Sequence, residues 1–304
     1  MRYYIFAAVL ILFSIISVLG IPILVNLTEE KLISLEIPEN NSAVAGIQTY
    51  NIPPLSKNTP PPDLSARSLF VLDLGTGTVL HQKDAHIPLP IASTTKIVTA
   101  LVGSEYFQPN SVLTVNKGAE IGGATVGLVR GENLSFRSLL YGMLLSSGND
   151  AAYALAENYP GGVVGFVSAM NKKVATLGLK NTHFENPAGF DHPKHFSSAF
   201  DLSKITEEAL KDSQLTKIFA TKDTDILSLD KKYHHKLQNL NKLLTDVKGV
   251  LGVKTGYTEG AKENLVTLVD RDGHKILAVV LGSDDRFGES TQLIEWIYDN
   301  FTWP

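Results

Sequence analysis

The sequence contains no cysteine and only a small imbalance between acidic and basic residues. Its 304 residues include 27 Lys and Arg against 31 Asp and Glu, a formal net charge of −4. The lack of cysteine excludes thiol catalysis, cysteine-ligated zinc and disulfide bonds, and leaves the redox compartment undetermined. Without a basic excess there is no reason to expect nucleic acid as a partner. A chain of this length can bury a large core without a disulfide or a metal ion.

Charged residues are also missing from the first segment of the chain. Between Tyr3 and Val25 there is none, and this apolar run is the source of the positive mean hydropathy of +0.06. The run is long enough to cross a bilayer as a helix. Because Arg2 precedes it and Glu29 and Glu30 follow it, we expect a cytoplasmic N-terminus and an exported remainder. A cleaved signal peptide is the alternative, but its apolar core is normally shorter and ends at a small-x-small site. An uncleaved anchor at residues 1–25, in the cytoplasmic membrane, is therefore favoured.

The rest of the chain divides by composition into a linker and one domain. Residues 26–64 carry prolines among Asn, Ser and Glu, which is typical of an extended extracytoplasmic linker. Residues 65–304 have the pattern of a catalytic domain. Strands are predicted over residues 68–73, 78–81, 250–254, 264–269 and 275–282, and helices over 93–106, 136–145, 151–157, 163–177, 201–211 and 289–301. Strands at both ends with helices between them predict an α+β fold, in which an antiparallel sheet flanked by helices is joined to a helical lobe.

The first motif that can carry chemistry is Ser93-Thr94-Thr95-Lys96. Positions i and i+3 share a face of a helix, so the serine hydroxyl and the lysine amine can meet. A serine hydroxyl needs a base, and an amine is a base only when it is neutral. Burial at the start of an apolar helix and a second nearby cation would both lower the lysine pKa. The spacing alone is weak evidence, because it recurs at Ser228-Leu229-Asp230-Lys231, which we interpret as a solvated turn.

Two further motifs follow in the expected order. Ser147-Gly148-Asn149 lies between two apolar helical stretches, where a hydroxyl and a carboxamide can relay a proton and hold a substrate amide; a helix cap is the alternative interpretation. Lys254-Thr255-Gly256 ends a predicted strand, where a cation and a hydroxyl can bind a carboxylate and the glycine lets a substrate backbone lie close. Together the three motifs match the set found in penicillin-binding proteins and serine β-lactamases.

On these motifs the chain resembles the serine D-Ala-D-Ala carboxypeptidases, which are the low-molecular-weight penicillin-binding proteins. Residues 186–191 (Asn-Pro-Ala-Gly-Phe-Asp), 195–202 and 252–258 resemble further signatures of that family. The resemblance extends from about Ser68 to Phe301 and implies the serine β-lactamase and penicillin-binding-protein fold. Many members continue into a β-rich domain and an amphipathic anchor, whereas this sequence ends at Pro304. We therefore expect the N-terminal segment to provide the membrane anchor.

The resemblance implies a role for each motif residue. Ser93 would be the acylated nucleophile, Lys96 its base and Ser147 the relay of a proton to the leaving D-alanine. The backbone N–H groups of Ser93 and Tyr257 would form the oxyanion hole.

The remaining roles concern substrate binding. Asn149 would hold the peptide backbone, Lys254 would supply positive potential, and Thr255, assisted by Arg286, would bind the terminal carboxylate beside Gly256. The expected partners are peptidoglycan stem peptides and acylating β-lactams, with no cofactor and no metal ion.

Other functions fit the sequence less well. A class A β-lactamase needs a Glu-x-x-Leu-Asn stretch after Ser147, and none occurs. A zinc peptidase is disfavoured because His192-Pro193-Lys194-His195 lacks a convincing third ligand. A D,D-endopeptidase acting on cross-linked stems remains an alternative because its chemistry is identical. A catalytically silent peptidoglycan-binding homologue is the other, although a pure binder does not need the polar groups of the three motifs.

Overall fold

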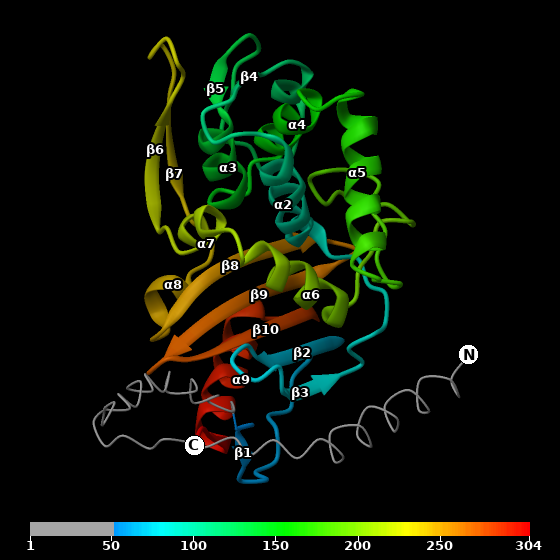
Figure 1. Ribbon diagram of the computed structural model, residues 1–304, viewed down its shortest axis with the longest axis vertical. Helices are drawn as coiled ribbons and strands as arrows, with labels where there is room; N and C mark the ends of the chain where they lie inside the picture. Colours follow the sequence, from blue (N-terminus) through cyan, green and yellow to red (C-terminus); the bar gives the residue numbers. More distant parts are fainter. Residues whose placement is uncertain (1–51) are drawn as a thin grey trace, which may run out of the picture. The chain divides into compact units, whose positions relative to one another are not determined.

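The computed structural model describes residues 52–304 (Figure 1). The predicted membrane anchor at residues 1–25 lies outside the described residues, as does most of the predicted linker. Over residues 52–304, no helix combines the length and the apolar composition needed to cross a membrane.

The centre of the domain is an antiparallel sheet of five strands in the order β3-β2-β10-β9-β8. In chain order the strands are β2 (Ser68–Asp73), β3 (Val79–Lys83), β8 (Val250–Thr258), β9 (Lys262–Arg271) and β10 (His274–Ser283). β2 pairs with β10, from Ile276 opposite Asp73 to Leu281 opposite Ser68. The first and last strands of this sheet in chain order, β2 and β10, therefore pair with each other inside it, as predicted, and β8 lies at one edge.

Both faces of this sheet are buried. Successive side chains of a strand point to opposite faces. Phe70 and Leu72 of β2 pack on the face covered by α6 (Ala199–Ala209), whereas Leu69 and Val71 pack on the face covered by α9 (Arg286–Asn300). Because both faces are covered, all six residues of β2 are buried, and its four central residues are all apolar instead of alternating with polar ones.

The helical lobe is built around α2 (Lys96–Tyr106), whose first eight residues are all buried. Its other helices are α3 (Phe136–Leu144), α4 (Asn149–Glu157), α5 (Gly162–Thr176) and α7 (Ser213–Phe219). α2 contacts α3, α4, α5 and α6, and Figure 1 shows it among them on one side of the sheet. A short 3₁₀ turn, η1 (Ala92–Thr95), precedes α2 and packs against β8 and β9. The predicted α+β architecture is confirmed.

The structure also contains short elements that the hydrophobic pattern does not predict. They are β4 (Val112–Thr114) paired with β5 (Asn133–Ser135), β6 (Asp223–Leu227) paired with β7 (His234–Gln238), the 3₁₀ turn η2 (Lys117–Glu120), α8 (Leu243–Asp246) and the helix α7 named above. β6 and β7 are rich in Asp, Lys and His, so an apolar periodicity is lacking there. The turn between them contains Ser228-Leu229-Asp230-Lys231, in agreement with the interpretation of that stretch as a turn.

The start of the domain differs from the predicted boundary at residue 65. β1 (Leu55–Ser56) pairs with β11 (Phe301–Thr302), which follows α9 at the C-terminus. Leu64 is buried in the same apolar cluster as α9. The last part of the predicted linker is therefore packed on the domain, because its backbone pairs with residues at the other end of the chain and Leu64 is buried beside α9.

Candidate active site

Ser93 and Lys96 lie at the junction between the helical lobe and the sheet. Ser93 is in η1 and is partly exposed, whereas Lys96, the first residue of α2, is fully buried. Lys96 Nζ is 2.9 Å from Ser93 Oγ, 2.8 Å from Asn149 Oδ1 and 2.7 Å from the carbonyl oxygen of Ala188. A neutral amine has two N–H groups and one lone pair. Because the amide and carbonyl oxygens can only accept hydrogen bonds, they take the two N–H groups, and the lone pair is left facing the Ser93 hydroxyl.

The surroundings of Lys96 favour this neutral form. Burial lowers the pKa of Lys96 well below its ordinary value, and the positive charge of Lys254 lowers it further. The carboxylate of Asp150 opposes both effects. A buried amine next to a second cation can therefore act as a base toward serine near neutral pH.

Ser147 and Asn149 come from the connection between α3 and α4. Ser147 is buried and has a left-handed backbone conformation with φ of +60°, which is uncommon for a residue with a side chain and is typical of functional sites. Asn149 is the first residue of α4 and contacts Lys96 directly. In the part of the chain that the structure describes, no hydrogen bond joins the Ser147 hydroxyl to Ser93 or Lys96. Gly148 holds the cap position of α4, so neither Asn149 nor Asp150 is its cap.

The third motif lies on β8, the edge strand. A Cβ atom on Gly256 would lie 2.9 Å from the carbonyl oxygen of Ile91 and 3.1 Å from the backbone nitrogen of Ser93. Glycine is therefore required where β8 passes against the turn that carries Ser93. An edge strand has free backbone groups that can pair with an extended peptide, so a peptide added to β8 would lie beside the serine.

The cations at this end of β8 form a positive region. Lys254 is buried, and burial together with the positive charge of Arg286 lowers its pKa to about 7. Its Nζ donates a hydrogen bond of 3.1 Å to the carbonyl oxygen of Thr255. Arg286, the first residue of α9, donates a hydrogen bond of 3.0 Å from Nη1 to the carbonyl oxygen of Gly256. Tyr257 follows on β8 with an exposed side chain. Such a region suits the carboxylate of a ligand.

A loop after α5 also contributes to the site, and residue types alone did not assign it a role. Ala188 accepts a hydrogen bond from Lys96. Gly189 has φ of +95°, and a Cβ atom there would lie 1.9 Å from the carbonyl oxygen of Ala92, so only glycine fits. Asn186 Oδ1 accepts hydrogen bonds from the N–H groups of Ala188, Gly189 and Phe190, which holds the loop in this shape. The turn-forming sequence Asn-Pro-Ala-Gly was the available signal.

His195 supports the turn before Ser93 from the other side. Its Nδ1 accepts the backbone N–H of Glu185, so Nε2 carries the proton and donates to Thr95 Oγ1 at 2.7 Å. Thr95 Oγ1 in turn donates to the carbonyl oxygen of Ala92, whose φ of +47° is left-handed. Burial lowers the pKa of His195 to about 4, so the ring is neutral. His195 is thus a buried loop residue, and within residues 52–304 no three His, Asp or Glu side chains gather to hold a metal ion.

Comparisons with known proteins agree on one family. A family model described as D-alanyl-D-alanine carboxypeptidase matches residues 55–285. The D-alanyl-D-alanine carboxypeptidase DacF of Bacillus subtilis is 35% identical over 246 residues, which cover 78% of this chain and 63% of the relative. The D-alanyl-D-alanine carboxypeptidase DacD of Escherichia coli is 32% identical over 275 residues, which cover 85% and 69%. The crystal structure of the Streptomyces K15 DD-transpeptidase superimposes with a TM-score of 0.75 at 31% identity, and the match covers 79% of this chain and 100% of that one.

Proposed function

The chain belongs to the D-alanyl-D-alanine carboxypeptidase family of serine peptidases, and from this premise we propose that it removes the terminal D-alanine from peptidoglycan pentapeptide stems. The observation that carries the proposal is the contact of Lys96 Nζ with Ser93 Oγ at 2.9 Å, because the other two partners of Lys96 are hydrogen-bond acceptors. The chain spans 63% of the length of the Bacillus subtilis relative, so the activity is proposed for the domain at hand.

In the first step Lys96 takes the proton of the Ser93 hydroxyl. Ser93 Oγ then bonds to the carbonyl carbon of the penultimate D-alanine, and the backbone N–H groups of Ser93 and Tyr257 stabilise the oxyanion. The C–N bond breaks, the proton passes to the leaving amine by way of Ser147, and D-alanine departs. Water then adds to the ester carbonyl and restores the serine hydroxyl, with Lys96 again accepting and returning the proton.

Substrate binding uses the edge of β8. The stem peptide would lie along β8 beside Gly256, and the Asn149 amide would hold its backbone. Its terminal carboxylate would bind Thr255 between Lys254 and Arg286. This arrangement explains why cations are retained at a buried position, where an uncompensated charge is costly.

The test compares three forms of the full-length chain. Wild type should be labelled covalently by a fluorescent penicillin and should release D-alanine from a peptide ending in D-Ala-D-Ala. Ser93→Ala should do neither. Ser228→Ala is the matched control because Ser228 and Lys231 repeat the same spacing in the β6–β7 turn, and it should react like wild type. Labelling that persists in Ser93→Ala would refute the assignment of the nucleophile. Fast hydrolysis of the penicillin adduct would indicate a β-lactamase instead.

We further propose that the domain is exported and tethered to the cytoplasmic membrane. The support is the uncharged segment from Tyr3 to Val25, flanked by Arg2 on one side and Glu29 and Glu30 on the other. Amino-terminal sequencing of the protein recovered from membranes tests this proposal. A mature start near residue 26 would show that the segment is removed.

A further inference from the structure

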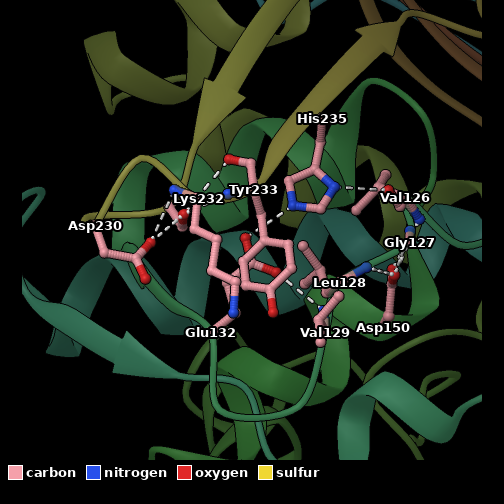
Figure 2. Close-up of polar contacts among 11 residues, drawn as sticks. Val126, Gly127, Leu128, Val129, Glu132, Asp150, Asp230, Lys232, Tyr233 and His235 are labelled. Carbon is pink, nitrogen blue, oxygen red and sulfur yellow. Dashed lines mark hydrogen bonds and ion pairs between the residues drawn. The ribbon is translucent and has the colours of Figure 1, made fainter.

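A buried carboxylate next to Asn149 takes no part in the steps above. Asp150, the second residue of α4, is 1% exposed. Its two oxygens accept hydrogen bonds of 3.0 to 3.1 Å from the backbone N–H groups of Val126, Gly127 and Leu128 (Figure 2). These three residues belong to the segment 121–131 between η2 and β5, here called the 121–131 loop. Asp150 therefore fixes this loop to the start of α4.

The 121–131 loop in turn fixes the side chain of Asn149. Its carbonyl oxygen at Gly122 accepts a hydrogen bond of 3.0 Å from Asn149 Nδ2, and its carbonyl oxygen at Ala124 accepts one of 2.7 Å from the Asn149 backbone nitrogen. Rotating the Asn149 amide by 180° would place its oxygen against the carbonyl oxygen of Gly122 and would direct its N–H groups at Lys96. Gly123 makes the close approach possible, because a Cβ atom there would lie 2.7 Å from Asn149 Nδ2 and its φ is +81°.

A second buried group holds the far end of the same loop. Glu132 Oε2 accepts the backbone N–H of Val129, and Glu132 Oε1 is 2.8 Å from His235 Nε2 on β7. His235 Nδ1 is 3.1 Å from the carbonyl oxygen of Val126 (Figure 2). That carbonyl can only accept, so Nδ1 carries a proton, and the contact with Glu132 requires another proton, on Nε2 or on the carboxyl group. The pair therefore joins the β6–β7 hairpin to the loop.

We propose that Asp150, Glu132 and His235 are positioning residues for acyl transfer, which hold the 121–131 loop so that its carbonyl groups keep the Asn149 amide oxygen directed at Lys96. The proposal rests on the proposed function. None of the three side chains contacts Ser93 or the β8 edge, so they act through the loop and through Asn149.

Asp150 has a second effect, through its charge. The charged groups that act on Lys96 are Lys254 from β8, which lowers its pKa, and Asp150 from α4, which raises it. His195 lies on the third side and is neutral. Replacing Asp150 by asparagine should therefore lower the pKa of Lys96 further, so that the acid limb of the acylation rate moves to lower pH. General damage to folding would not move that limb in this direction.

The experiment measures the second-order rate of acylation by a fluorescent penicillin across pH, on full-length wild type, Asp150→Asn and Asp230→Asn. Asp230 is the matched control, because it lies in the exposed β6–β7 turn, where it accepts hydrogen bonds from Ser228 and Lys232 (Figure 2). We expect Asp150→Asn to slow acylation by about 100-fold at its optimal pH, with the acid limb displaced downward. Asp230→Asn should match wild type in both respects.

A double-mutant cycle tests whether the effect passes through Asn149. In the Asn149→Ala background, Asp150→Asn should cost only a few-fold, because residues that act through one another are not additive. Glu132→Gln, which keeps the shape but removes the charge, should slow acylation without moving the acid limb, and this loss should also disappear with Asn149→Ala. If Asp150→Asn does not fold, the comparison of Glu132→Gln with and without Asn149→Ala tests the inference instead.

Three outcomes would overturn the inference. Asp150→Asn and Glu132→Gln could acylate as fast as wild type, their full loss could persist without Asn149, or Asp230→Asn could reproduce their effect. If wild type itself neither binds penicillin covalently nor releases D-alanine, the proposed function fails and this inference falls with it. A reactive wild type with equally reactive variants refutes the inference alone.

Discussion

The buried ammonium group of Lys254 should make the folded protein less stable than it could be, by an amount that depends on pH. Lys254 is 2% exposed, and its pKa falls from the ordinary 10.5 to about 7, first by burial and then by the charge of Arg286. Between these two values the unfolded chain binds more protons at this side chain than the folded chain does. The stability of wild type therefore rises with pH through this window.

Lys254→Met removes this dependence, because methionine has a similar length and no charge. From the two pKa values, the cost of Lys254 to the folded state is about 4 kcal/mol near pH 7 and about 2 kcal/mol near pH 9. Changes in packing add a constant that does not vary with pH. The difference in free energy of unfolding, variant minus wild type, should therefore shrink by about 2 kcal/mol from about pH 7 to about pH 9.

Urea denaturation of both full-length proteins at the two pH values measures this difference. Lys262→Met is a control for the loss of a lysine, since Lys262 forms an exposed ion pair with Asp284 and such pairs contribute little. A difference for Lys254→Met that stays constant or grows with pH would refute the argument that the folded state maintains this cation at a cost. The variant should also lose turnover of carboxylate-terminated peptides, since a stabilised binding site commonly loses function.

Three further predictions concern the turn around Ser93 and the two lysines. The kcat/KM of peptide hydrolysis should rise with pH as Lys96 loses its proton and fall above about 7 as Lys254 loses its charge, and a profile without an alkaline decline would contradict the role of the Lys254 charge. Gly189→Ala should lower the free energy of unfolding by about 3 kcal/mol, because the added methyl group meets the Ala92 carbonyl oxygen; unchanged stability in urea would count against this. His195→Ala should cost about 2 kcal/mol and slow acylation, because the backbone N–H group of Glu185 and the buried hydroxyl of Thr95 lose their partner. The variant His195→Gln, which can both accept and donate, should recover most of that rate, and failure to do so would show that the ring itself matters.

Local patterns predicted the parts of the structure that depend on neighbouring residues. The i, i+3 spacing of Ser93 and Lys96 brings their side chains together on any helical turn, and the structure places Nζ 2.9 Å from Oγ. The apolar runs predicted the five strands of the main sheet. The paired, charged strands β6 and β7 were missed because each is stabilised by the other and by the helical lobe, and not by an apolar face of its own. The same hairpin carries His235, so its link to the 121–131 loop could not be foreseen.

The order and residue types of the three motifs were sufficient to identify the family. The serine, the lysine and the carboxylate-binding residues that the chemistry requires each occur in a short stretch of chain. The state of those groups depends on the tertiary structure. Lys96 can act as a base because the folded chain buries it, places Lys254 near it and supplies two acceptors from Asn149 and Ala188. The left-handed conformations at Ala92 and Ser147 are unfavourable for an isolated chain and persist because packing imposes them. The sequence therefore determined which chemistry is available, and burial and long-range contacts decided which proton each group holds.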